Sequence, residues 1–308
     1  MITLQQMIIF FIMIGVGVIA KRCKIINEEG MKQISALVIN VTTPAIILSA
    51  GIHADNSLTF DEFIFAFVLG CVLFALLILL AEISPFIFRL KKPDSRVLKL
   101  MIVFCNIMFI GLPLLSNIYG HRAVIYLMIF NLPSSLLLFT YGLIVVSGTP
   151  IKSIKSIFIK ILNPGLISAL FAFILYFTNI KFPEIVVQPI DMIGSVTGPL
   201  AMILIGASMS NLKILDLFSD FKLVIFSLFK MFFMPLAIML LLKQFIDDVD
   251  LLATSLILIA TPAGNMISMF ATIYCPKANN VATRGISLTT LMSVVTIPLL
   301  SIITGIGN

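Results

Sequence analysis

Long apolar runs separated by short polar segments make up most of this chain of 308 residues. The runs are about 20 residues long, which is the length that a helix needs to cross the roughly 30 Å hydrocarbon layer of a membrane. The pattern therefore predicts an all-α polytopic membrane protein. The ten spans that we predict are residues 4–20, 31–50, 62–88, 97–118, 123–147, 158–178, 187–209, 222–242, 251–274 and 283–305.

Composition supports this interpretation. Hydrophobic residues make up 60% of the chain and charged residues 11%, and the mean hydropathy is +1.17. A water-soluble chain of this length would need a charged surface. A net charge of +6 would favour a nucleic-acid partner only if the charges formed a patch, but they lie in the connections between predicted spans. We expect a lipid bilayer, and no nucleic acid, as a partner.

The positions of the 20 Lys and Arg residues predict the orientation. With the amino end outside, 16 of them fall in inner connections or in the first three residues of the spans that follow, whereas the outer connections hold only Arg122, Lys181 and Lys243. Positive charge favours the cytoplasmic side, so we expect both termini outside the cytoplasm and the protein in the cell membrane. In a signal peptide the basic residues precede the apolar run, but here residues 21–24 follow it, so this run is expected to remain as a helix.

The chain divides into two halves of five predicted spans. Residues 1–148 form the first half, residues 149–157 form a cytoplasmic hinge, and residues 158–308 form the second half. Because five is odd, the second half enters the membrane in the opposite direction, which is the inverted repeat found in many secondary transporters. A Val-Thr-x-Pro pattern that starts at Val41 in span two and at Val196 in span seven supports an internal duplication.

Two polar breaks that contain proline occur at corresponding places in the halves, NIMFIGLP in span four and TPAGN in span nine. A proline removes a backbone hydrogen bond, and lipid offers no water to satisfy the freed groups. Such breaks are tolerated where protein or a water-filled cavity surrounds them, so we predict a site where the two helices come apart near the membrane midplane. Its expected residues are Asn106, Gly111, Pro113, Thr261, Pro262, Gly264 and Asn265.

The ends of the broken helices predict the chemistry of this site. Amino ends carry partial positive charge and free amides, which suit an anionic group, whereas freed carbonyls at the other ends suit a cation. An amide in the bilayer centre is costly unless it is paired, so Asn106 and Asn265 are expected to line the site. Other prolines within spans are explained more simply as kinks. They are Pro85, Pro133, Pro235 and Pro298.

Lys230 is the one basic residue well inside a predicted span. It either extends toward the inner surface or faces the interior, where it would be a counter-charge for an anionic substrate or for Glu82. We favour the interior and add Lys230 to the expected substrate-binding residues.

Motifs of known catalytic sites are absent from the sequence. It has no HExxH or GxSxG motif and no paired aspartates within spans, so we expect neither an enzyme nor a cofactor. Its two histidines, His53 and His121, fall in predicted outer loops and are expected to be solvated. The four cysteines lack the spacing of a metal site and are expected to be apolar filler. They are Cys23, Cys71, Cys105 and Cys275.

Several of these motifs resemble one known family. NIMFIGLPLL in span four resembles the Asn-x-x-Phe-x-Gly-x-Pro-Leu pattern of the auxin efflux carrier family, whose bacterial members include malate and malonate transporters. The likeness extends to NVTTPAIILSA, GPLAMILIGASM, FKMFFMPLA and ATPAGNMISMFATIY in spans two, seven, eight and nine. The resemblance implies five plus five inverted helices, with spans four and nine crossing at Pro113 and Pro262. It also implies a moving transport bundle and a static scaffold of spans one, two, six and seven, which dimerises.

We therefore expect a secondary transporter that moves a small organic anion, such as a carboxylate, by alternating access. A sodium-coupled symporter of the bile acid type and a channel or sensor on the same fold are the alternatives. The acidic residues in or beside spans lie mostly near span ends, which disfavours a proton relay through carboxylates. They are Asp61, Glu62, Glu82, Asp191 and Asp250. The substrate, the direction of transport and the coupling cation, Na⁺ or H⁺ if there is one, remain open.

Overall fold

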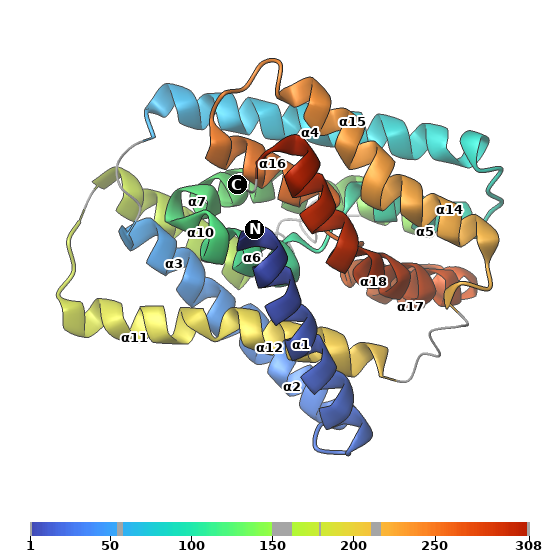
Figure 1. Cartoon of the computed structure of the whole chain (residues 1–308), viewed down its shortest axis with the longest axis horizontal. Coiled ribbons are helices and arrows are strands. Elements are labelled where there is room, and N and C mark those ends of the chain that lie inside the picture. The colour runs from blue at the N-terminus through green and yellow to red at the C-terminus, as the bar shows by residue number, and fades with distance from the viewer. Residues whose placement is uncertain (1, 54–57, 150–161, 179, 211–216, 307–308) are drawn as a thin grey trace.

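The computed structural model describes residues 2–53, 58–149, 162–178, 180–210 and 217–306, which are almost entirely helical (Figure 1). Seven helical stretches within these ranges are long and apolar enough to cross a membrane, and three shorter apolar helices accompany them. The prediction of a polytopic all-α membrane protein is therefore confirmed. Most of the expected hinge at 149–157, and the beginning of the sixth predicted span, lie outside the described residues.

The first half of the chain supplies the helices of predicted spans one to five. Spans one and three are single helices, spans two and five each contain a π-helical turn, and span four is interrupted. In chain order the elements are α1 (Ile2–Arg22), α2 (Glu28–Leu37), η1 (Val38–Thr42), α3 (Thr43–His53), α4 (Phe60–Ile87), α5 (Asp94–Val103), η2 (Ile107–Gly111), α6 (Leu112–Ile118), α7 (Gly120–Leu137), η3 (Leu138–Gly142) and α8 (Leu143–Ser147).

The second half supplies the helices of predicted spans six to ten. Span seven is divided between two helices, span eight contains a π-helical turn, and span nine is interrupted. In chain order the elements are α10 (Pro164–Thr178), α11 (Glu184–Ser195), α12 (Thr197–Met209), α14 (Phe221–Leu228), η4 (Phe229–Phe233), α15 (Met234–Leu242), α16 (Val249–Ala260), α17 (Met266–Tyr274), the 3₁₀ turn η5 (Pro276–Ala278) and α18 (Asn279–Thr304).

Three of the π-helical turns lie directly before a proline. The turns η1, η2 and η4 end two residues before Pro44, Pro113 and Pro235. A proline ring collides with the carbonyl four residues back in a regular helix and has no N–H to donate. A π-helical turn widens the hydrogen-bond ladder at that place, so the helix continues past the proline. These three prolines therefore shape their helices without interrupting them.

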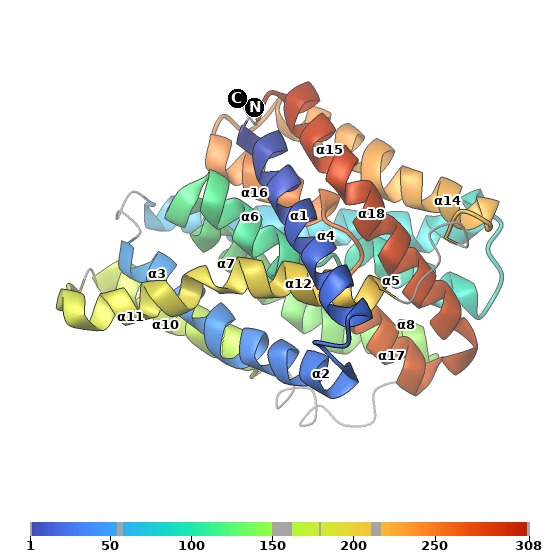
Figure 2. The same cartoon turned by 60° about the horizontal axis from the view of Figure 1, so that its bottom comes forward.

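The helices of spans one, two, six and seven, namely α1–α3 and α10–α12, form one group that we call the scaffold helices. Figures 1 and 2 both show α3, α10 and α11 on the opposite side of the molecule from α14 and α15, whereas α1 also contacts α18. Helices α1 and α12 approach so closely that a Cβ added to Gly17 would lie 2.1 Å from the carbonyl oxygen of Ile203. A Cβ added to Gly206 would lie 1.9 Å from the carbonyl oxygen of Ile14. Small residues allow such backbone contact between membrane helices.

The remaining helices, α4–α8 and α14–α18, form a second group that we call the bundle helices. Two of them lie at its centre, because every side chain is buried from Ala123 to Phe130 in α7 and from Leu251 to Ala260 in α16. A helix that is apolar on all sides is expected in such a central place. The interrupted spans four and nine thus lie in the more deeply packed group.

Charged contacts of the bundle lie at its two ends. Arg122 pairs with Asp248 where the sequence predicts outer connections, and Lys99 pairs with Glu82 where it predicts inner ones. Spans of alternating direction produce this grouping, since the beginning of one span then lies beside the end of the next. The orientation of the whole protein in the membrane stays a prediction.

Candidate functional site at the helix crossing

The interrupted helices of spans four and nine meet through two short extended segments. The backbone N–H of Asn106 donates to the carbonyl oxygen of Pro262 at 2.7 Å. The N–H of Gly264 donates to the carbonyl oxygen of Phe104 at 2.9 Å. No water reaches the core of a bilayer, so each segment supplies hydrogen bonds that the other lost when its helix ended. We call this pairing the helix crossing.

The crossing lies at Pro262 in span nine, as expected, but in span four it does not lie at Pro113. Cys105 faces Ala263 as an antiparallel pair, and Pro113 follows about two turns later within α6. There Pro113 packs against α12, since a Cβ added to Gly198 of α12 would lie 3.2 Å from the Cβ of Pro113. The prediction was wrong because η2 carries the helix past the proline. Cys105, expected to be apolar filler, contributes its backbone to the crossing instead.

Gly111 lies beside the crossing rather than in it. A Cβ added there would lie 3.0 Å from the side chain of Ile257 and 3.7 Å from that of Thr261. The glycine thus lets η2 approach the carboxyl end of α16. Of the seven residues expected at the two breaks, only Asn106, Pro262 and Gly264 make the hydrogen bonds of the pairing. Thr261 and Asn265 flank it, and Gly111 and Pro113 lie farther along span four.

Lys230 reaches the crossing from η4. Its side chain is fully buried, and its Nζ donates to the carbonyl oxygen of Thr261, the C-cap residue directly after α16. Within the described ranges no carboxylate lies within 4.0 Å of this ammonium group. The interior position predicted for Lys230 is therefore confirmed.

Glu82 is not the partner of Lys230, contrary to one of our expectations. Its carboxylate lies 2.5 Å from Nζ of Lys99 and accepts a hydrogen bond from the hydroxyl of Tyr141 at 2.8 Å. These partners lie near the end of the bundle, where a long side chain from α4 reaches them directly. The charge of Lys230 thus remains without an acidic partner in the part of the chain described.

The two asparagines expected at the site both begin a half-helix. Asn106 precedes η2 and Asn265 precedes α17, yet neither side chain caps its helix. Asn106 is only 5% exposed and Asn265 is exposed, and neither side chain makes a hydrogen bond to a described residue. Two amino ends with partial positive charge therefore lie at the crossing, each with an amide that can bind a ligand.

Thr289 also supports the crossing, and sequence reasoning missed it. Its buried Oγ1 accepts a hydrogen bond from the N–H of Ala263 at 3.2 Å and donates to the carbonyl oxygen of Gly285 at 2.8 Å. A threonine in an apolar span can hold a broken neighbour in this way. The adjacent pair Thr289 and Thr290 in span ten was the only sign of it in the sequence.

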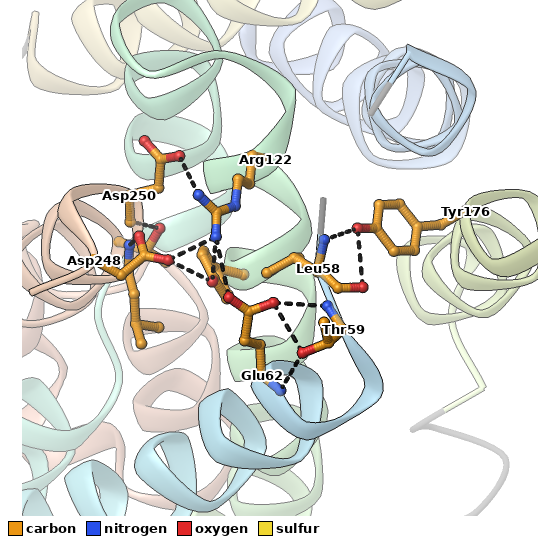
Figure 3. Close-up of polar contacts among 10 residues, drawn as sticks. Leu58, Thr59, Glu62, Arg122, Tyr176, Asp248 and Asp250 are labelled. Carbon is orange, nitrogen blue, oxygen red and sulfur yellow. Dashed lines mark hydrogen bonds and ion pairs between the residues drawn. The ribbon is translucent and has the colours of Figure 1, made fainter. Parts of the chain in front are cut away.

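A second polar cluster, at one end of the bundle, surrounds Arg122 (Figure 3). Its guanidinium lies 2.8 Å from Asp248, 3.6 Å from Glu62 and 3.7 Å from Asp250. The hydroxyl of Tyr126 also donates to Asp248, at 2.8 Å. These contacts join α4, α7 and α16. All four charged side chains are partly exposed, so solvent weakens each pair and the cluster is a connector rather than a site.

His53 is not simply solvated, contrary to expectation. Its Nε2 lies 2.8 Å from the carboxylate of Asp191, which also accepts from the hydroxyl of Ser49 at 2.6 Å. The ring of His53 stacks on that of His121 with centroids 5.2 Å apart. Sequence patterns could not predict this contact, because the partners lie far apart in the chain, on α3, α11 and α7.

Comparison with known protein families supports a transport role. Residues 2–158 and 149–301 match a family model described as membrane transport protein. Together the two matches include almost the whole chain. A search of curated proteins found no match.

Proposed function

Because the chain belongs to the auxin efflux carrier family of membrane transport proteins, we propose that it is a carrier for a small organic anion, such as a carboxylate. Alternating access in the cell membrane is the proposed mechanism. The observation that carries the proposal is the buried ammonium group of Lys230 beside the crossing. An enzymatic role is not part of it.

Charge balance favours an anion at the crossing. A buried positive charge is costly unless an opposite charge compensates it. The acidic side chains of the described residues pair elsewhere or lie toward the ends of the bundle, as Glu82 and Asp248 do. An anionic substrate would supply the missing negative charge.

The substrate ligands that we propose are Asn106 and Asn265, with the amino ends of η2 and α17. An amide NH₂ group donates to a carboxylate, and charge-assisted bonds of this kind are stronger than neutral ones. Amino ends of half-helices serve anionic groups in other carriers with broken helices. Lys230 would act from behind the crossing through its charge, since its ammonium group contacts Thr261 rather than open space.

Uptake into proteoliposomes tests this function. Purified protein would first be screened against mono- and dicarboxylates by thermal shift, and the stabilising compounds would then be used as radiolabelled probes. We expect saturable uptake that becomes faster when the same anion is present inside the vesicles. Flux that does not saturate and does not respond to internal anion would favour a channel, and transport of cations alone would refute the substrate class.

Orientation is part of the proposal, with both termini outside the cytoplasm. In a variant without the native cysteines, an impermeant thiol reagent should label Phe245→Cys in intact cells. It should label Lys91→Cys only after the cells are opened. The reverse result would overturn the proposed topology. The scaffold helices are the surface that we propose for a homodimer, which crosslinking in membranes would test.

A further inference from the structure

We propose that the ammonium group of Lys230 is the resident cation of the helix crossing, in the place that a coupling metal ion would otherwise fill. The carrier would then need no sodium. This inference concerns the coupling of the proposed transport reaction, but its main test uses stability and needs no substrate.

The carboxyl end of α16 requires a positive charge. The last hydrogen bond of this helix runs from the N–H of Thr261 to Ile257, so the carbonyl groups that follow have no partner within the helix. Their dipoles add up to a partial negative charge at this end. It is buried among apolar side chains, where water cannot neutralise it.

Lys230 meets this requirement from a neighbouring helix. Its Nζ contacts the carbonyl oxygen of Thr261, and it also interacts with the sulfur of Met231 at 3.6 Å and with the thiol of Cys105 at the crossing. An ammonium group and a sodium ion carry the same charge and both bind carbonyl oxygens. They cannot both occupy the same side of one carbonyl group.

A second oxygen of the same residue lacks a partner. Oγ1 of Thr261 is buried and forms no hydrogen bond to any described residue. If the ammonium group were removed, the carbonyl oxygen of Thr261 would face the vacated volume, and the hydroxyl group of the same residue could turn toward a cation bound there. Oxygen ligands of this kind suit hard cations, so loss of Lys230 should turn the place it fills into a weak cation site.

The first arm of the experiment measures the wild-type protein. Its melting temperature would be determined in sodium, potassium and choline chloride, and binding of ²²Na⁺ would be measured directly. We expect equal melting temperatures and no saturable binding of sodium. Saturable ²²Na⁺ binding, or stabilisation by sodium alone, would overturn the proposal.

The second arm uses two replacements of Lys230. Lys230→Ala removes the charge and leaves space, so it should lower the melting temperature by about 3 to 6 °C, which methylammonium or sodium should partly restore. Lys230→Met removes the charge but fills the space, so it should be destabilised without such rescue. Lys222→Ala, at an exposed position in the first turn of α14, is the matched control and should respond to neither.

Each result has a defined meaning. Rescue of Lys230→Ala but not of Lys230→Met supports the proposal, and full stability of Lys230→Met would refute it. If Lys230→Ala does not fold, the sodium measurements on the wild-type protein and the stability of Lys230→Met still decide. Failure of the wild-type protein to move any organic anion would refute the proposed function and leave these stability results unaffected.

Discussion

The scaffold helices and the helix crossing solve the problem of packing in lipid in opposite ways. In the scaffold, α1 and α12 remain whole and touch backbone to backbone at Gly17 and Gly206. At the crossing, α5 and α16 end inside the protein, and hydrogen bonds across the chain replace those of the helix. Whole helices leave no polar group free to bind a ligand. Broken helices do leave such groups, so the polar groups that can bind a ligand lie where the regular helices end.

The largest expected effect comes from filling the contact within the scaffold. Gly206→Leu places a side chain where the backbone of α1 now lies, and we expect a loss of more than about 3 kcal/mol or no folded protein at all. Gly15→Ala on α1 is the control, because a Cβ added there meets nothing within 4 Å. Size-exclusion profiles and melting temperatures measure both variants. Normal stability of Gly206→Leu would mean that α1 and α12 do not meet in this way.

The next effect concerns ligand affinity at the crossing. Asn106→Ala and Asn265→Ala should each weaken substrate binding by about ten- to hundredfold, since a contact to a charged group contributes about 1.5 to 3 kcal/mol. Stability should change little, because neither amide bonds to a described residue. Lower melting temperature with unchanged affinity would make these amides structural and would remove them from the site.

A comparison of two prolines sharpens the position of the crossing. Pro262→Ala restores an N–H that can extend α16 and draw Ala263 away from Cys105, so transport should slow about tenfold. Pro113→Ala should slow transport less than twofold, because Pro113 is part of α6 and packs against α12, away from the crossing. Initial uptake rates at equal expression measure the difference. Equal rates for the two variants would contradict the assignment of the break in span four to Phe104–Asn106.

The smallest effect is expected at the Arg122 cluster. Arg122→Gln leaves Asp248, Asp250 and Glu62 without their shared cation, yet partial exposure limits the loss to about 1 kcal/mol. The loss should shrink further in high salt, which screens the repulsion among the carboxylates. Melting temperatures at low and high salt test this. A salt-independent loss would show that packing of the Arg122 side chain matters more than its charge.

Sequence reasoning predicted the helices well and the crossing only in part. Apolar length predicts a membrane helix because the bilayer fixes that length, and α4 follows the predicted span closely. The proline-containing polar segments NIMFIGLP and TPAGN predicted that two helices would break. They could not predict that Cys105 would face Ala263, because that register depends on how distant segments pack. Pro113 misled for the same reason, since η2 is a response of the backbone that no residue type specifies.

The hydrogen bonds of the crossing have a consequence for biosynthesis. The N–H of Asn106 and the carbonyl oxygen of Phe104 find their partners at Pro262 and Gly264, in the other half of the chain. During synthesis from the amino end, span four enters the membrane long before span nine exists. Until span nine is made, the backbone groups at the break of span four lack these hydrogen-bond partners, which is costly in lipid. The nascent first half should accordingly be a client of the insertion machinery until the last spans arrive.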